Sequence, residues 1–235
     1  DRPGGRIFTL AANEFSAPVD LGAEFVHGKP PLMRSLIKEA SLKMHEGEGR
    51  LWHVACNRVS EDDPFDGDWG EFMRLLNQLE TDMPIGEFLK MYFKGESHSG
   101  LREAVTRFVQ GFDAADPDKA SAFSLRDEWA DPDGALMGRH VEGGLGSLVY
   151  HLERECVRNG VQFHFSAPVR KIEWTRNSVR VHTGSREVTA SFTVITIPPS
   201  VLKTGSVRFV PEIDAHLDAV KKVETGGVIK FLFEF

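Results

Sequence analysis

The sequence predicts a fold of mixed class, α/β with α+β, and three observations support this. Residues 69–130 carry apolar side chains at helical spacing. From residue 161 onward, short alternating stretches separated by turn residues predict strands instead. The chain opens with a glycine-rich stretch, residues 1–28, which belongs to neither pattern. At 235 residues the chain is long enough for one large domain or two small ones.

Composition excludes several classes of function. The chain is 41% hydrophobic and 27% charged, which is ordinary for a soluble globular protein. A net charge of −7 argues against nucleic acid as a partner. A membrane span needs an apolar run of about 18 residues. The sequence has no such run, so we expect no membrane span. Cys56 and Cys156 lie far apart and the nine histidines are scattered, so we expect neither a disulfide framework nor a metal site.

Helices are predicted where apolar residues recur on one face. In residues 69–79, for example, Phe72, Leu75, Leu76 and Leu79 fall on a single face. Pro84 suits the first turn of the next helix, and Gly160 is a natural end for the last one. The predicted helices are 32–42, 69–79, 85–93, 101–112, 124–129 and 145–159.

Strands are predicted where apolar and polar residues alternate between turn signals. Asn177 and Gly184 separate three of these stretches. The predicted strands are 51–54, 161–165, 169–174, 178–182, 187–190, 192–197 and 226–233.

The opening stretch contains the first candidate site. Gly4 and Gly5 precede Arg6, and a glycine pair lets backbone approach a ligand closely because no Cβ intervenes. The Arg6 guanidinium is a planar, permanently charged fork suited to a phosphate. For this tetrapeptide alone, PGGR, an ordinary surface turn with a solvated arginine is the favoured interpretation.

A second motif follows at residues 20–28. Asp20-Leu21-Gly22-Ala23-Glu24 leads through Phe25 and His27 to Gly28. The order PGGR and then D-x-G-A-E-x-V-H-G resembles the flavin-containing amine oxidase family, which includes the monoamine and polyamine oxidases. The resemblance implies FAD as cofactor, with Gly4, Gly5 and Arg6 at its diphosphate and ring.

The same resemblance assigns further roles. It implies that Gly22, Ala23, Glu24 and Phe25 line the flavin, and that the residue at Val169 contacts the adenine through its main chain. Val169 can at the same time be a plain buried strand residue. Glu24 and His27 stand where polar groups could meet an amine substrate, and a salt bridge within the loop is the alternative for either.

Lys230 is the candidate catalytic residue. It interrupts the apolar run of residues 226–233, and a lysine there must be paired or must point to solvent from an edge strand. Gly226, Lys230 and Phe235 match the spacing G-x-x-x-K-x-x-x-x-F of the amine oxidases. In that family the lysine holds a water against the flavin, which favours the paired alternative.

The resemblance also implies how the domains are divided. Residues 1–30 and 140–200 would form part of a Rossmann-like FAD-binding domain, interleaved with a mixed-sheet, helical substrate domain of residues 31–139 and 201–235. The family pattern begins earlier, with a G-x-G-x-x-G unit, and continues beyond Phe235. We therefore expect a fragment of a longer protein, which by itself would bind FAD weakly and be inactive.

The function implied for the parent protein is FAD-dependent oxidation of an amine to an imine, with oxygen as the acceptor. Its partners would be a small-molecule amine and molecular oxygen, in a soluble protein for which a cytoplasmic location is favoured. Two alternatives stay open: a protoporphyrinogen-oxidase-like or desaturase-like flavin enzyme, and a module that has lost the cofactor. Lys230 argues against the first, and the presence or absence of bound flavin tests the second. The sequence does not indicate an oligomeric state.

Overall fold

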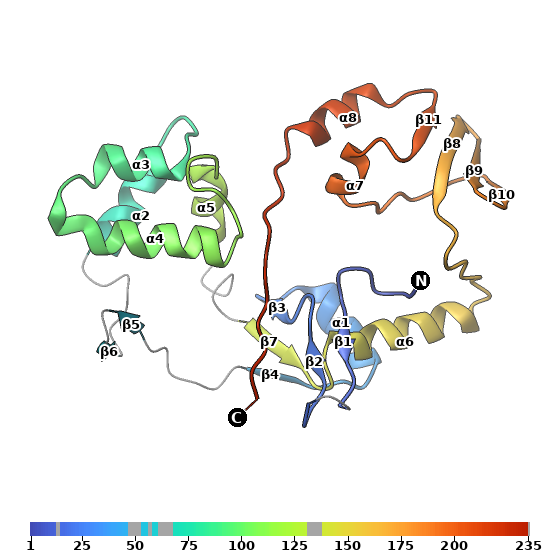
Figure 1. Cartoon of the computed structure of the whole chain (residues 1–235), viewed down its shortest axis with the longest axis horizontal. Coiled ribbons are helices and arrows are strands. Elements are labelled where there is room, and N and C mark those ends of the chain that lie inside the picture. The colour runs from blue at the N-terminus through green and yellow to red at the C-terminus, as the bar shows by residue number, and fades with distance from the viewer. Residues whose placement is uncertain (13–14, 47–52, 56–57, 61–67, 131–137, 235) are drawn as a thin grey trace. The chain divides into compact units, whose positions relative to one another are not determined.

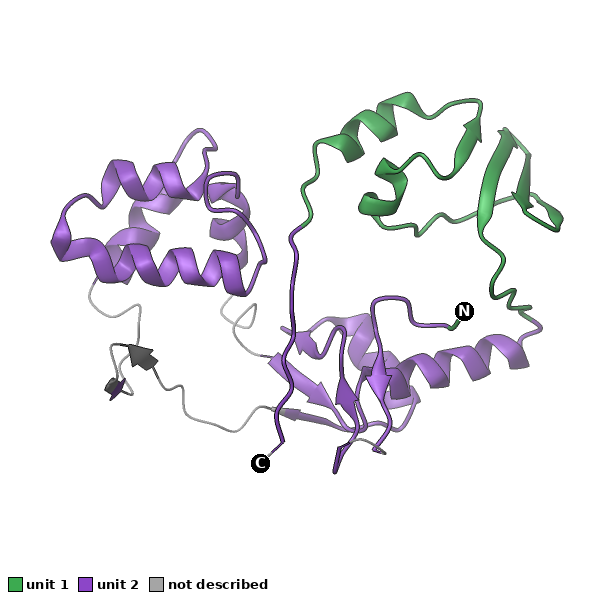
Figure 2. Ribbon diagram, in the orientation of Figure 1, with its two compact units in different colours: residues 1–2, 161–225 green, residues 3–160, 226–235 purple. Residues whose placement is uncertain are grey.

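The structure is a computed structural model that describes residues 1–235 except 13–14, 47–52, 56–57, 61–67, 131–137 and 235. It contains two compact units (Figure 2), which are described here one at a time. One unit comprises residues 3–160 and 226–235, and the other comprises residues 1–2 and 161–225. No helix among the described residues is long and apolar enough to cross a membrane.

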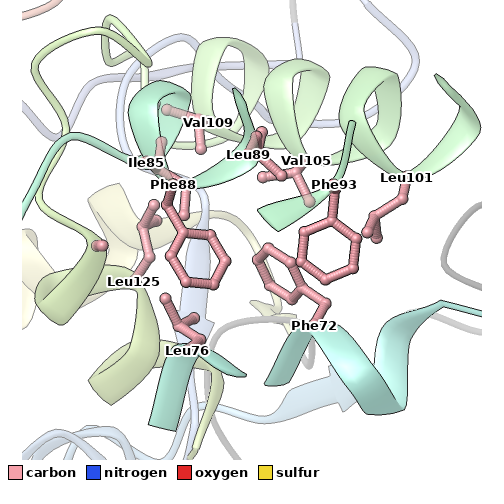
Figure 3. Packing of buried hydrophobic residues seen from close by; sticks show 11 residues of the cluster. Phe72, Leu76, Ile85, Phe88, Leu89, Phe93, Leu101, Val105, Val109 and Leu125 are labelled. Carbon is pink, nitrogen blue, oxygen red and sulfur yellow. The ribbon is translucent and has the colours of Figure 1, made fainter. Parts of the chain in front are cut away.

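The first unit contains a cluster of helices, coloured green in Figure 1: α2 (Trp69–Asn77), α3 (Ile85–Tyr92), α4 (Ser99–Gly111) and α5 (Ala122–Trp129), with the 3-10 turn η1 (Glu96–His98) before α4. Their apolar faces meet around Phe72, Phe88 and Phe93, which are fully or almost fully buried (Figure 3). Ser121 caps α5, because its hydroxyl accepts a hydrogen bond from the Ser124 amide at 3.1 Å.

A three-stranded antiparallel sheet forms the other part of this unit, in the order β3 (Phe25–His27), β7 (Gly138–Val141), β4 (Met44–Glu46). Helices α1 (Pro31–Glu39) and α6 (Leu145–Arg158) pack on one face of it. Their shared core is formed by Val26, Ile37, Val141, Leu145 and Leu148. Two short hairpins complete the unit, β1 (Thr9–Leu10) with β2 (Val19–Asp20) and β5 (His53–Ala55) with β6 (Arg58–Ser60).

The second unit is built on a four-stranded sheet in the order β10 (Glu187–Ala190), β9 (Ser178–Thr183), β8 (Val169–Thr175), β11 (Arg208–Val210). β11 runs parallel to β8, and the other pairs are antiparallel. Helices α7 (Pro199–Lys203) and α8 (Asp214–Lys221) follow. The core consists of Ile172, Val179 and Phe209, with partly buried apolar residues around them.

The mixed composition of helices and sheets confirms the coarse fold class. All six predicted helices are present, each within a few residues of its predicted ends. The predicted strands 169–174, 178–182 and 187–190 are also present. The prediction 51–54 falls partly outside the described residues. The interleaving of a partial Rossmann-like domain with a substrate domain stays a prediction, as do its boundaries.

Three predicted strands are wrong: 161–165, 192–197 and 226–233 form no strand in the structure. These segments do have alternating or apolar sequences. A strand, however, also needs a neighbouring strand with which to exchange hydrogen bonds. Residues 192–197 pair with no strand in any of the described sheets, and Phe192 and Val194 are 85% and 87% exposed. Conversely, the sequence analysis predicted none of the following elements: the β1–β2 hairpin, β3, β4, β6, β7, β11, α7 and α8.

Candidate functional site

The glycine turn at the start of the chain has the backbone that only glycine adopts readily. Gly4 has φ 96° and Gly5 has φ 55°, both in the left-handed region. The Ile7 amide closes the turn by donating to the Gly4 carbonyl at 2.9 Å. Gly4, Gly5 and Arg6 are all exposed, so the turn presents bare backbone beside a guanidinium.

Gly22 joins the second motif to this turn. The Ala23 amide donates to the Arg6 carbonyl at 3.1 Å, and the Leu21 amide donates to the Phe8 carbonyl at 2.8 Å. A Cβ added to Gly22 would lie 2.0 Å from the Arg6 carbonyl oxygen, a distance at which atoms overlap. Gly22 is therefore needed for the contact between two segments of this chain, whatever further contact it makes with a ligand.

These residues fit a cofactor that carries a diphosphate and a flat ring. An added Cβ on Gly5 would have no heavy atom within 4 Å, so the turn is open to a ligand. Arg6 supplies the charge that a diphosphate needs. Exposed Ala23 and half-exposed Phe25 lie on the segment that follows and present an apolar surface.

Lys230 is paired and does not project freely into solvent. Its Nζ donates to the Asp20 carbonyl at 2.6 Å and to the carboxylate of Glu24. The side chains of Lys230 and Glu24 are each 29% exposed. The extended segment that carries Lys230, drawn in red at the end of the chain in Figure 1, is thereby attached to the loop that precedes β3.

Gly226 explains how this extended segment runs past the end of α4. A Cβ on Gly226 would lie 1.6 Å from the carbonyl oxygen of Ala114, so no other residue fits without moving backbone. Gly226 and Lys230, which the sequence singled out by their spacing, thus both have specific contacts in the structure. Phe235 lies outside the described residues.

His140 lies beside the same carboxylate, and no pattern in the sequence selects it. Its Nδ1 is 3.4 Å from Oε1 of Glu24. Its ring packs against Phe25, with the ring centroids 4.6 Å apart. The only signal is the pairing of β3 with β7, which places Phe25 directly opposite His140, and that pairing is not readable from either segment alone.

His27 belongs to a row of aromatic rings. Its centroid is 5.7 Å from that of Phe25 and 5.5 Å from that of Phe112, which in turn stacks on Phe108 at 4.8 Å. The His27 and Phe112 side chains are exposed. An exposed row of rings beside a half-buried ion pair offers an apolar surface with a polar end.

Asp20 is a second residue that sequence reasoning used only as part of a motif. Its side chain is 7% exposed, and Oδ2 accepts from the Leu145 amide, at the start of α6, at 3.1 Å. The Thr9 hydroxyl donates to Oδ1 of Asp20 and accepts from the Gly146 amide at 2.8 Å. Asp20 thus caps α6 with its carboxylate and holds Lys230 with its carbonyl.

Asp113, which directly follows Phe112 in the sequence, lies close enough to Glu128 of α5 for the two carboxylates to interact. Burial raises the pKa of Asp113 to about 6, and the nearby Glu128 carboxylate adds to this effect. Burial also raises the pKa of Glu128. Oδ2 of Asp113 is buried and has no hydrogen-bond partner among the described residues.

Val169 is the one predicted site residue outside this unit. It is the first residue of β8 and packs at the edge of the core of the second unit. Its predicted contact with the cofactor stays a prediction. All other predicted site residues belong to the unit that contains the glycine turn and Lys230.

Comparisons of this chain with a family model and with curated proteins agree on one family. A family model described as flavin containing amine oxidoreductase matches residues 1–235. Polyamine oxidase 4 of Oryza sativa is 26% identical over 91% of this chain and 48% of its own length. Protein FLOWERING LOCUS D of Arabidopsis thaliana is 24% identical over 100% of this chain and 32% of its own length. The chain thus spans about half, or less, of the curated relatives that it matches.

Solved structures share the fold. Cyclohexylamine oxidase from Brevibacterium oxydans superposes with a TM-score of 0.72 at 19% identity, covering 93% of this chain and 56% of the other. Putrescine oxidase bound to putrescine superposes with a TM-score of 0.68 at 19% identity, covering 90% of this chain and 53% of the other.

Proposed function

Because this chain belongs to the flavin-containing amine oxidoreductase family, we propose that the protein of which it forms a part oxidises an amine to an imine and passes the electrons to oxygen. The observation that carries the proposal is the position of Lys230, which is held half-buried against the motif that follows the glycine turn. The names of the relatives, polyamine oxidase and putrescine oxidase, agree with an amine as substrate.

FAD is the cofactor of this family. When bound, FAD supplies the hydride acceptor for the carbon next to the amine nitrogen. The Gly4–Gly5 backbone and Arg6 would hold its diphosphate and ring edge. The left-handed glycine backbone allows the cofactor to approach closely, and the guanidinium supplies positive charge. Gly22, Ala23 and Phe25 would line the ring, and Val169 would contact the adenine.

Lys230 would act on water and protons. An ammonium has three N–H donors, and two of those of Lys230 go to Asp20 and Glu24. The third has no partner among the described residues, so it can hold a water molecule at a fixed position. A fixed cation and an ordered water are the groups that stabilise negative charge as oxygen is reduced.

Two residues would meet the amine. His27 lies in the row of aromatic rings and offers a ring nitrogen that can accept a proton or a hydrogen bond. Glu24 is already paired with Lys230, so its effect on the amine would come through charge more than through a direct hydrogen bond. The imine formed would hydrolyse in water to a carbonyl compound and an amine.

The test is an absorbance spectrum of the full-length protein, purified without added flavin and mixed anaerobically with a panel of amines. We expect flavin bands that at least one amine bleaches and that return when oxygen is admitted. Flavin bands that no amine bleaches would point to another flavin oxidoreductase of the same superfamily. A colourless protein that takes up no FAD would refute the proposal and favour a non-catalytic module.

A further inference from the structure

The carboxylate of Glu24 has a different neighbour on each oxygen. Oε2 accepts from Nζ of Lys230, and Oε1 lies 3.4 Å from Nδ1 of His140. We propose that His140 is a positioning residue for Lys230, which acts through Glu24 and makes the hold on Lys230 depend on pH. The catalytic importance of Lys230 rests on the proposed function, but the coupling of the three side chains does not.

The sheet fixes His140 in this place. Residues directly opposite each other in antiparallel strands project to the same face, so Phe25, His140 and His45 share one face of the β3-β7-β4 sheet. The core lies on the other face. A Cβ on Gly138 would lie 2.6 Å from the ring of Phe25, so this glycine admits the ring that packs against His140.

Several charged or titratable groups surround His140. Arg139, its neighbour on β7, donates to the Gly28 carbonyl at 2.7 Å. The Asp20 carboxylate on β2 is engaged with the start of α6. The groups that face His140 from the elements around it are Glu24 and His27 at β3, His45 on β4 and Lys230 on the extended segment. Among the described residues, Glu24 is the carboxylate in contact with the ring, so a proton on His140 acts first on Glu24.

The consequence follows from charge. While His140 is neutral, Lys230 is the one cation paired with the Glu24 carboxylate among the described residues. A protonated His140 is a second cation on the same carboxylate, and it competes with Lys230 for the negative charge. When a fall in pH protonates His140, the ion pair that holds Lys230 weakens and its ammonium becomes more available.

The experiment measures Lys230 directly in the full-length flavoprotein. Lysines are acetylated with a water-soluble active ester between about pH 5.5 and pH 8.5, on either side of the histidine range. Mass spectrometry then gives the rate at Lys230 relative to that at exposed Lys94, a ratio that cancels the reagent's own pH dependence. We expect this ratio to rise roughly threefold as the pH falls, the size expected for weakening a half-exposed ion pair.

Three variants separate the possible causes. In His140→Gln the ratio should stay low and independent of pH, because nothing competes for Glu24. In Glu24→Gln it should be high at every pH, because the ion pair is absent. His45→Gln is the matched control, since His45 lies on the same sheet face, directly opposite His140, and should leave the wild-type profile unchanged.

Two results would overturn the proposal: a wild-type ratio that does not change with pH, or a His140→Gln ratio that still follows the wild-type profile. The test does not require catalysis. An acetylation pattern as expected in a protein that no amine reduces would leave the coupling intact and refute the proposed function. If amines reduce the protein but the Lys230 ratio does not change with pH, the proposed function stands and the coupling is refuted.

Discussion

Lys230 and Glu24 form an ion pair although 206 positions separate them in the sequence. The pair attaches the last described segment of the chain to the loop between β2 and β3. The Asp20 carbonyl accepts a further hydrogen bond from the same ammonium, at 2.6 Å. Two acceptors, one a backbone carbonyl and one a carboxylate on a half-buried side chain, fix the position of the charge better than one exposed contact could.

Replacement of Lys230 tests its proposed role. In Lys230→Met the rate at which the reduced protein reacts with oxygen should fall about a hundredfold, the lower end of what one positioned acid or base contributes. Reduction by the amine should change much less, because Lys230 is proposed to act on water and oxygen. Stopped-flow absorbance measures the two half-reactions separately. Lys94→Met is the control, and equal losses in both half-reactions would contradict the assigned role.

Gly22→Ala should separate the two cofactor-binding segments. Its Cβ would lie 2.0 Å from the Arg6 carbonyl oxygen, so the backbone of one segment must move. We expect a loss of roughly 1–3 kcal/mol in the free energy of unfolding, the usual cost of overpacking, together with weaker FAD binding. Thermal unfolding and flavin titration measure the two effects.

Gly100→Ala is the matched control for this glycine. Gly100 lies in α4, and an added Cβ there would meet nothing within 4 Å. Alanine should therefore stabilise the helix by about 0.5–1 kcal/mol. If both variants behaved alike, the close approach of Gly22 to Arg6 would not be what requires glycine.

Asp20→Ala should loosen the start of α6. The variant removes the carboxylate that accepts from the Leu145 amide and from the Thr9 hydroxyl. Loss of a helix cap that leaves buried donors unpaired costs about 1–3 kcal/mol. Hydrogen exchange should show faster exchange at the first turn of α6. Asp20→Asn, which keeps an acceptor in the same place, should recover much of the loss.

Asp113 should make the helical cluster less stable as the pH rises. Its pKa is raised to about 6 by burial and by the Glu128 carboxylate, so the folded state keeps a proton that the unfolded state has lost above about pH 4. The unfolding free energy therefore falls between about pH 4 and about pH 6 and is level above that range. Asp113→Asn should reduce this fall, and the part that remains comes from Glu128, whose pKa burial also raises. Unfolding curves at each pH measure it, and Asp127→Asn serves as the exposed control.

Glu173 should give the opposite dependence in the other unit. A hydrogen bond from Lys171, followed by one from His182, lowers the pKa of Glu173 to about 2. The resulting stabilisation is complete above about pH 4.5 and is lost as the pH falls toward 2, because the unfolded state binds the proton first. In Glu173→Gln this acid-side loss should shrink, and an unchanged profile would contradict the assignment. Glu212→Gln is the exposed control.

The sequence by itself determined α1 to α6 and the motifs, but not α7 and α8. The spacing of apolar residues predicts six helices. This works because a helix forms its hydrogen bonds within one segment, so the apolar pattern that marks it is local. Gly4, Gly5, Arg6 and the residues from Gly22 to Phe25 were selected for the same reason, since a turn and a short motif are local features. The resemblance to a flavin enzyme family came from their order, and the family model that matches the whole chain confirmed it.

Only the tertiary structure decided which distant residues meet. Apolar alternation over 192–197 and 226–233 predicted strands, but a strand requires a pairing partner, and neither segment pairs with a strand among the described residues. His140 entered the site because β3 and β7 pair, and Lys230 because its ammonium reaches Glu24 and Asp20. Such contacts depend on register and chain path, which no single segment encodes.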